Sequence, residues 1–250
     1  MRFSQQMRDL NWLVACPIAH RGLHGGNLIE NCEGAFAAAI ENDYAIECDV
    51  QLTADGEAVV FHDDTVDRLL DGSGQVNSFT TKQLKKMAFK NGTGHVQTLA
   101  ELLEQVAGRC TVVIELKTLW DNNVNLSKRA LEVLHNYDGP HALMSYDPLM
   151  ISCVALDSPT TIRGIIGERS ATDTYKTLPF SQNLELRQMS HLTKTKPHFI
   201  SYYFRDLPYH PVTQFRAKGN PVITFTIRNP QQAASAKRYC DQVTFQDYHE

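Results

Sequence analysis

Short apolar runs bounded by turn residues recur along the whole chain, and helical patterns separate most of them. The clearest helical patterns span residues 33–41, 99–106, 126–134 and 230–239. The apolar runs have the length and composition of buried strands, and they lie at 13–19, 44–50, 58–61, 111–116, 142–146, 161–166, 198–203, 222–227 and 242–245. Because strands that alternate with helices form parallel sheets, the sequence predicts an α/β fold.

The number of predicted strands indicates how the sheet closes. Nine strands are one more than the eight of a TIM barrel. Asp55 and Gly56 form a turn signal between two neighbouring runs, which makes 58–61 the second strand of a hairpin rather than a barrel strand. The chain has 250 residues, the usual size of one such barrel. We therefore expect a single TIM (β/α)8 barrel domain over residues 1–250.

The alternation of strands and helices is interrupted between residues 64 and 96. This stretch contains four glycines and one short helical pattern near 82–87. It directly follows the predicted hairpin. The sequence therefore predicts a small inserted cap subdomain at about 64–96, after the second-strand hairpin.

Composition and charge exclude several classes of protein. Hydrophobic residues make up 42% of the chain and charged residues 21%, so it can bury a core. The formal net charge of −4 argues against a nucleic-acid partner, which would need a cationic face. The apolar stretch at 10–18 is too short and broken for a signal peptide, and no run is long enough for a membrane span, so we expect a cytoplasmic protein. The six cysteines include no Cys-x-x-Cys pair, which favours buried reduced thiols over a zinc site.

Acidic residues stand in two of the predicted strands, where an unpaired charge costs several kcal/mol to bury. Glu47 and Asp49 are two residues apart on one strand, so their side chains project to the same face. Glu115 lies near the end of the next barrel strand. Three converging carboxylates repel one another unless a cation lies among them, and oxygen ligands favour Mg²⁺ or Ca²⁺. The spacing indicates a site for one divalent cation, and a structural network of ion pairs is the alternative.

Two histidines also stand at the ends of predicted strands. His20 ends the first strand and His62 ends the hairpin strand, where imidazole can transfer protons near neutral pH. Arg21 follows His20, and Lys117 follows Glu115 by two residues, so both can offer positive charge to phosphate oxygens. A histidine at a strand end often has only a structural hydrogen bond, and we assign that role to the other eight. We therefore expect an anion site beside the cation, with His20 and His62 as the proton-transfer pair.

Asn31 precedes the helical pattern that begins near residue 33. It can cap that helix or contact the substrate, and both alternatives stay open. Aromatic residues that end later strands either line the pocket or pack in the core, namely Tyr146, Tyr202, Tyr203 and Phe225. The candidate substrate contacts are Arg21, Lys117, Asn31 and Phe225.

These residues belong to a series of motifs that resembles the glycerophosphodiester phosphodiesterase family. The order and spacing of the motifs are specific, and the series spans nearly the whole chain. It consists of Ala19-His20-Arg21-Gly22, Glu30-Asn31, Glu47-x-Asp49-Val50, His62-Asp63, Asp67-Arg68, Gly72-x-Gly74, Thr98-Leu99-x-Glu101, Ile114-Glu115-Leu116-Lys117, Tyr146-Asp147-Pro148 and Thr224-Phe225-Thr226.

The resemblance implies a metal-dependent TIM barrel that hydrolyses glycerophosphodiesters to glycerol 3-phosphate and an alcohol. In such enzymes a glycerol hydroxyl attacks phosphorus, and water then opens the cyclic phosphodiester. The family's metal ligands match Glu47, Asp49 and Glu115. Its general acid and base, its phosphate-binding arginine and the lysine after its third carboxylate match His20, His62, Arg21 and Lys117.

The chain departs from the family pattern at Cys32, Tyr146 and Phe225, where threonine, phenylalanine and tryptophan are usual. None of these changes removes a charge or a ligand, so we expect them to affect which alcohol is accepted. The alternatives for this chain are a related phosphodiesterase that acts on lysophospholipids, sphingomyelin or sugar phosphodiesters, because the same site can accept different alcohols, and a catalytically silent barrel that binds a phosphodiester without cleaving it. The mostly polar stretch 64–96 favours small water-soluble diesters, and the intact site favours catalysis.

Overall fold

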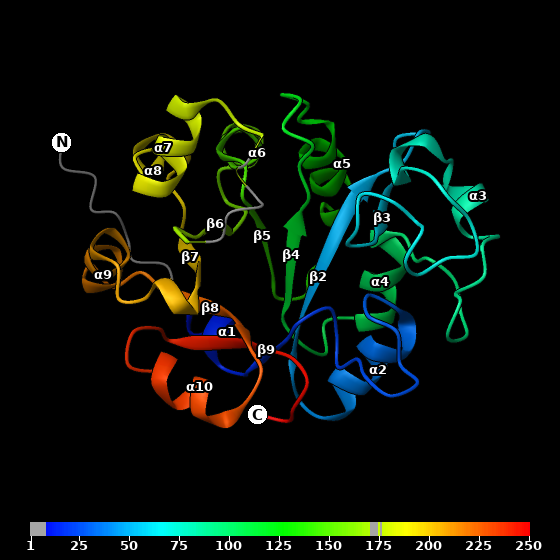
Figure 1. Ribbon diagram of the computed structural model, residues 1–250, viewed down its shortest axis with the longest axis horizontal. Helices are drawn as coiled ribbons and strands as arrows, with labels where there is room; N and C mark the ends of the chain where they lie inside the picture. The colour runs from blue at the N-terminus through cyan, green and yellow to red at the C-terminus, as the bar shows by residue number, and fades with distance from the viewer. Residues whose placement is uncertain (1–8, 171–174, 176) are drawn as a thin grey trace.

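Eight parallel strands close into a barrel in the computed structural model, which describes residues 9–170, 175 and 177–250 (Figure 1). The strands are β1 Ile18–Ala19, β2 Ala45–Leu52, β4 Val112–Leu116, β5 His141–Ser145, β6 Arg163–Gly167, β7 Phe199–Tyr203, β8 Val222–Ile227 and β9 Gln242–Phe245. The barrel closes because β1 pairs with β2 on one side and with β9 on the other. The predicted TIM barrel is confirmed.

A further strand, β3 Ala58–Val60, pairs antiparallel with the end of β2. The register joins Leu52 to Ala58, so the chain reverses direction between them. Gly56 lies in this turn with φ +81°, a conformation that glycine adopts without the steric cost of a side chain. The predicted hairpin therefore forms, and it accounts for the ninth strand.

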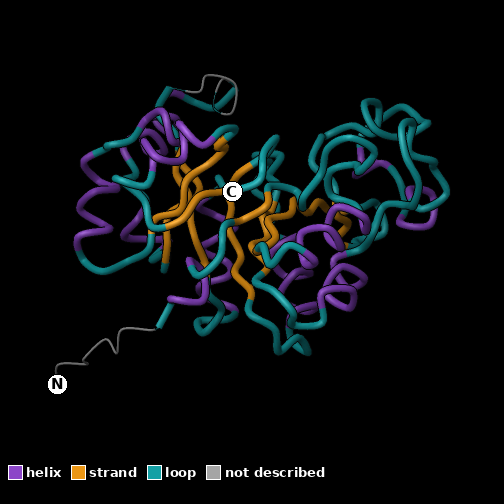
Figure 2. The backbone as a smooth tube through the Cα atoms, turned by 90° about the horizontal axis from the view of Figure 1, so that it is seen from below, coloured by secondary structure: helices purple, strands orange, loops and turns teal. Residues whose placement is uncertain are grey.

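Most of the helices connect strands and cover the outside of the barrel, and the first of them precedes the first strand. They are α1 Asn11–Val14, α2 Glu33–Glu41, α4 Leu99–Val106, α5 Asn125–Leu134, α6 Pro148–Asp157, α7 Phe180–Gln188, α8 Leu192–Thr195, α9 His210–Ala217 and α10 Pro230–Ala236, with the 3-10 helix η2 Phe204–Asp206 after β7. Figure 2 shows the strands at the centre with helices on either side. Thr98 and Glu101 form a capping box that satisfies free backbone N–H groups at the start of α4. In the described part of the chain, each helix lacks the length and apolar character that crossing a bilayer requires.

Alternate residues of each strand face the barrel interior, as the two-residue period of a strand requires. The interior nearest the amino ends of the strands is filled by an apolar cluster that includes Ala45 and Val113. The residues between them along each strand face outward and form a larger apolar cluster with the helices. Continuing the same alternation toward the carboxyl ends of β2 and β4 places three acidic residues inside the barrel: Glu47, Asp49 and Glu115.

The predicted strand at 13–19 is wrong in its first half. Helix α1 ends at Val14, and β1 begins only at Ile18. Pro17 has no N–H group to donate to a neighbouring strand, so regular pairing starts after it. Leu13 is nevertheless fully buried in the interior cluster. The apolar run therefore correctly indicates burial, but part of it is helical.

The segment between β3 and α4 folds around a small apolar core of its own. It contains η1 Val76–Ser78 and α3 Thr81–Leu84. Its core joins Val66 and Leu70 to Ala35 of α2 and Val59 of β3. Figure 1 shows α3 at the edge of the molecule, on the side of β3 and α4. This packing fixes the segment to the barrel, while its role as a cap stays a prediction.

Candidate active site

The polar residues singled out in the sequence meet at the carboxyl ends of neighbouring strands. Asp49 of β2 and Glu115 of β4 are paired in register, so their side chains point to the same face. His20 directly follows β1, and Lys117 directly follows β4. The carboxyl ends of barrel strands form one mouth, and the fold thereby gathers residues that are far apart in the sequence.

Glu47, Asp49 and Glu115, here called the carboxylate cluster, have ligand oxygens that all lie within 4.8 Å of one another. Only 2% of Glu47 and 1% of Asp49 is exposed to solvent. Burial, together with the charges of Asp49 and Glu115, raises the pKa of Glu47 well above its usual value. Burial acts in the same direction on Asp49, but positive charges, led by that of Lys117, outweigh it and lower the pKa of Asp49. The protein thus holds three mutually repelling carboxylates together, and a bound cation relieves such repulsion.

Two basic side chains offset part of this negative charge. Lys117 Nζ lies 2.9 Å from Glu115 Oε1 and 3.5 Å from Asp49 Oδ1. Burial alone would lower the pKa of Lys117, but Glu115 and Asp49 raise it, so the ammonium stays charged. Arg21 Nε lies 3.4 Å from Asp49 Oδ2, and Arg21 Nη1 donates to Glu30 Oε1 across 2.8 Å. Both predicted phosphate-binding residues therefore lie directly beside the carboxylate cluster.

Asn31 does not cap α2. The N-cap residue is Cys32, which makes no side-chain cap hydrogen bond, and Asn31 is 2% exposed. The Nδ2 group of Asn31 instead donates to Asp49 Oδ2 across 2.8 Å. Arg21 and Asn31 have positive φ angles of 58° and 54°, so the loop between β1 and α2 turns sharply at both. The capping alternative is wrong, and substrate contact through Asn31 stays a prediction.

Each of the two histidines is anchored through Nδ1 to a side-chain oxygen. His20 Nδ1 donates to Gln246 Oε1, and His62 Nδ1 donates to Asp63 Oδ1, both across 2.8 Å. Burial, followed by the charge of Arg21, lowers the pKa of His20 to about 3, so this imidazole is neutral at pH 7. A neutral imidazole with its proton on Nδ1 can accept another at Nε2. The hydrogen bonds therefore suit both histidines to proton transfer at Nε2.

A second group of potential metal ligands differs from the carboxylate cluster, because an arginine is hydrogen-bonded to its acidic members. Glu30, His62 and Asp63 have ligand atoms within 4.8 Å of one another. The guanidinium of Arg68 donates to both of these carboxylates. Although burial acts the other way, the arginine contacts lower the pKa of Glu30 and bring that of Asp63 to about 2. The protein itself thus supplies the positive charge that this group requires.

Phe225 belongs to an aromatic group on the strands that complete the barrel. Its ring centroid lies 6.4 Å from that of Tyr146 and 6.0 Å from that of Tyr203. The alternation along β7 turns Tyr203 inward and Tyr202 outward. Tyr202 is fully buried and stacks on Tyr209. Tyr202 is therefore a core residue, while contact between Phe225 and the substrate stays a prediction.

Sequence reasoning misses the residues that orient the predicted histidines. Gln246 directly follows the last strand, so the rule that selects polar residues at strand ends could have found it. Asp63 stands beside His62 at the end of the hairpin strand, so the same rule selects it, although its hydrogen bond to His62 appears only in the folded chain. Arg68 occurs in the family-like motifs without interrupting an apolar strand, so its spacing alone gave no signal of a role.

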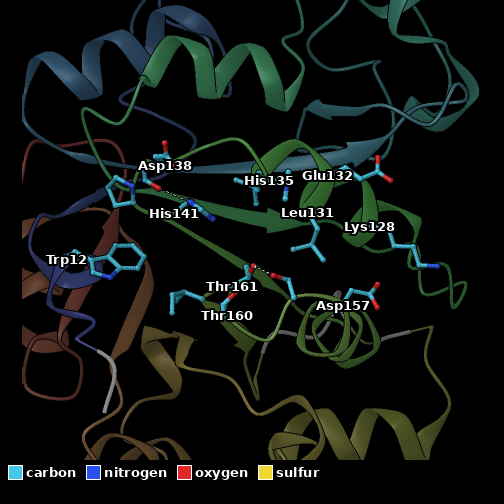
Figure 3. A pocket seen from close by; sticks show the side chains of 15 residues that line it. Trp12, Lys128, Leu131, Glu132, His135, Asp138, His141, Asp157, Thr160 and Thr161 are labelled. Atoms are coloured by element: carbon cyan, nitrogen blue, oxygen red, sulfur yellow. Dashed lines mark hydrogen bonds between the residues drawn. The ribbon is translucent and has the colours of Figure 1, made fainter. Parts of the chain in front are cut away.

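A cavity of about 980 Å³ lies away from this mouth (Figure 3). Its lining comes from α5 and from the loops that precede β5 and β6, as Figure 3 shows for His135, His141 and Thr161. The carboxylate cluster lies near the carboxyl ends of the strands, whereas β5 and β6 begin at this cavity. The two features are therefore separate.

Residues 20–244 match the family model described as the glycerophosphoryl diester phosphodiesterase family. A glycerophosphodiester phosphodiesterase from Caldanaerobacter subterraneus is 41% identical over 109 residues, which cover 40% of this chain and 44% of that protein. The chain thus spans less than half the length of this curated relative in the match.

Solved structures share the fold over nearly the whole chain. A phosphodiesterase from Oleispira antarctica, solved in complex with the product sn-glycerol-3-phosphate, has a TM-score of 0.78 and 22% identity, covering 94% of this chain and 95% of that one. A glycerophosphodiester phosphodiesterase from Parabacteroides distasonis has a TM-score of 0.74 and 21% identity, covering 92% of both chains. At these identities the likeness shows the barrel fold.

Proposed function

Because the chain belongs to the glycerophosphoryl diester phosphodiesterase family, we propose that it hydrolyses glycerophosphodiesters to glycerol 3-phosphate and an alcohol. The Oleispira antarctica relative was solved with sn-glycerol-3-phosphate as its product, which supports this choice of product. The proposal treats residues 1–250 as one catalytic domain, with 64–96 as its cap. The observation that carries it is the in-register pairing of Asp49 with Glu115, which forms the carboxylate cluster beside the two anchored histidines.

The carboxylate cluster would hold one Mg²⁺ or Ca²⁺. Its donors are carboxylate oxygens, the ligands that these hard cations prefer. The raised pKa of Glu47 supports the assignment, because its causes are burial and the negative charges of Asp49 and Glu115, which a cation in their midst would offset. When bound, the ion would offset negative charge on the phosphoryl group.

Arg21 and Lys117 would bind the phosphoryl oxygens. Both side chains are mostly buried, with 16% and 20% of their surfaces exposed, and both lie beside Asp49. Positive charge that is fixed before the substrate arrives stabilises a charged transition state without reorganisation. The two residues therefore supply electrostatic stabilisation, while the histidines move protons.

His20 and His62 would transfer protons at Nε2. One of them takes the proton from the attacking glycerol hydroxyl, and the other protonates the leaving alkoxide. Their roles reverse when water opens the cyclic phosphodiester. Gln246 and Asp63 hold Nδ1 of each ring and so keep Nε2 available for both steps.

The test is the release of glycerol 3-phosphate from glycerophosphocholine by the purified chain. We expect release that stops in EDTA and returns when Mg²⁺ or Ca²⁺ is added in excess. Full activity in EDTA would exclude the metal dependence, and no release from a panel of glycerophosphodiesters would exclude the activity. Faster cleavage of lysophosphatidylcholine than of glycerophosphocholine would instead favour the lysophospholipid alternative.

A further inference from the structure

Arg68 makes four hydrogen bonds to two carboxylates beside the proposed active site. Its Nε and Nη2 donate to Asp63 Oδ2 and Oδ1 across 2.6 and 3.0 Å. Its Nη1 and Nη2 donate to Glu30 Oε2 and Oε1 across 3.0 and 2.6 Å. One planar guanidinium therefore holds both carboxylates in a two-point contact, a geometry that the single ammonium of lysine cannot reproduce.

Each of these two carboxylates in turn holds a residue of the proposed machinery. Asp63 Oδ1 accepts the hydrogen bond from His62 Nδ1, and Glu30 Oε1 accepts one from Arg21 Nη1. An ionised carboxylate has no proton to donate, so Asp63 requires the proton of His62 to be on Nδ1. Arg68 is therefore connected to His62 through Asp63 and to Arg21 through Glu30.

Arg68 itself is held by the segment between β3 and α4. Val66 and Leu70, on either side of it, are fully buried in the small core of that segment. Asp67 accepts hydrogen bonds from the Ser73 hydroxyl and the Gly74 backbone, and its own carbonyl oxygen accepts one from Lys90. The backbone at Arg68 is therefore fixed, although 47% of its side chain is exposed.

We infer that Arg68 is a positioning residue, through which the segment between β3 and α4 orients His62 by way of Asp63 and Arg21 by way of Glu30. The inference rests on the proposed function, because it assigns Arg68 to the same site. Exposed ion pairs contribute little to stability, so the expected effect of losing Arg68 is on the rate. A small displacement of a catalytic group can lower the rate by about 10²-fold.

The test compares kcat and KM of Arg68→Ala with those of the wild type, on the glycerophosphodiester that the wild type cleaves fastest. We expect kcat to fall by about 10-fold to 10²-fold and millimolar guanidinium to restore part of it. Arg68→Lys keeps the charge but loses the two-point contact, and it should also be slow. Asp63→Asn leaves the segment intact and should cause a similar loss of kcat.

Arg129 provides a matched control, because its hydrogen bonds go to Glu57 and Glu132, which are not residues of the proposed site. It also binds a carboxylate at two points, with Nε and Nη2 each 2.9 Å from an oxygen of Glu57, and 33% of its side chain is exposed. Arg129→Ala should change kcat by less than about twofold. It should shift the thermal midpoint about as much as Arg68→Ala, because exposed ion pairs make similarly small contributions to stability.

A double variant distinguishes positioning from a general structural effect. In a His62→Ala background, Arg68→Ala can act only through Arg21, so its effect on kcat should be several-fold smaller than in the wild type. An equal loss in both backgrounds, or an unchanged kcat in Arg68→Ala, would overturn the inference. If Arg68→Ala fails to fold, Arg68→Lys and Asp63→Asn decide in the same way. A wild type that cleaves none of the diesters would instead overturn the proposed function.

Discussion

Asn31 holds Asp49 from two sides. Its Nδ2 donates to Asp49 Oδ2 across 2.8 Å, and its Oδ1 accepts from the Asp49 backbone N–H across 3.3 Å. The backbone N–H of Arg21 similarly donates to Glu47 Oε2 across 3.0 Å. The loop that follows β1 therefore fixes two carboxylates of the neighbouring strand, which is how outer contacts set the direction of a metal ligand.

Asn31→Ala should weaken the binding of the cation more than it lowers the maximal rate. The variant leaves Asp49 in place but frees its carboxylate to rotate, and the loss of such outer contacts costs about 10-fold to 10²-fold in metal affinity. Activity titrated against Mg²⁺ or Ca²⁺ measures this as a higher half-saturating concentration. Asn42→Ala, which removes a hydrogen bond to Ala38 on the exposed end of α2, is the control. An unchanged half-saturating concentration would show that Asn31 does not hold the metal ligand.

Glu47→Gln should stabilise the chain in EDTA and make it less responsive to added cation. The variant replaces an acid whose pKa is raised in the folded state by burial and by the charges of Asp49 and Glu115, so it removes an unfavourable group, and a pKa difference of one unit corresponds to about 1.4 kcal/mol. For a chain of this size, a change of about 1 kcal/mol moves the thermal midpoint by roughly 2–4 °C. Excess Mg²⁺ or Ca²⁺ should stabilise the wild type more than the variant. A cation that binds the folded state stabilises it, and the variant lacks one of the side chains proposed to bind the cation. Equal shifts for both proteins would argue against a cation in the carboxylate cluster.

His20→Ala and His62→Ala should each lower kcat by about 10²-fold or more, the usual contribution of a positioned acid or base. Initial rates on glycerophosphocholine at saturating cation measure this effect. His135→Ala provides the control, because His135 is exposed on the far side of the barrel. Near-native rates in both variants would assign the proton transfers to other groups.

His191 should make the chain less stable in mild acid. This residue is 1% exposed, and burial lowers its pKa from 6.5 to about 4. Below pH 6.5 the unfolded chain therefore binds a proton that the folded chain does not, and stability falls until the pH reaches about 4. Between pH 7 and 5 the wild type should lose about 2 kcal/mol more than His191→Gln. Urea unfolding of the wild type and His191→Gln at the two pH values measures the difference.

The sequence predicted most of the strands because buried strands are short, apolar and bounded by turn residues. It failed at 13–19, where the apolar residues are buried in a helical turn rather than a strand. It also gave no clear pattern for α6 and α7, although α6 begins with an Asp147-Pro148 signal. The weak periodicity of such helices arises because α6 is apolar on most sides and α7 is polar on most sides.

The charged half of the site was predictable because buried charges in apolar strands are costly and therefore conspicuous. Glu47, Asp49 and Glu115 were found in this way, and the structure brings them together. Arg68 was not predictable, because it acts through contacts that only the folded chain creates, whereas the strand-end rule that found the histidines could also have found Gln246. Asn31 shows the same limit, since its position before a helix suggested a cap while its side chain binds Asp49.

The length of β2 has a consequence for how this protein can change over evolutionary time. Residues Ile46 to Val50 are paired with β4, and only Val50 to Leu52 are paired with β3. Insertions or deletions in the turn after Leu52 would displace β3 and the segment beyond it, yet leave the alignment of Asp49 with Glu115 untouched. Because His62 and Arg68 follow β3, such a change would shift one proposed proton-transfer residue and its positioning contact while the carboxylate cluster stays in place, so these two parts of the site can diverge separately.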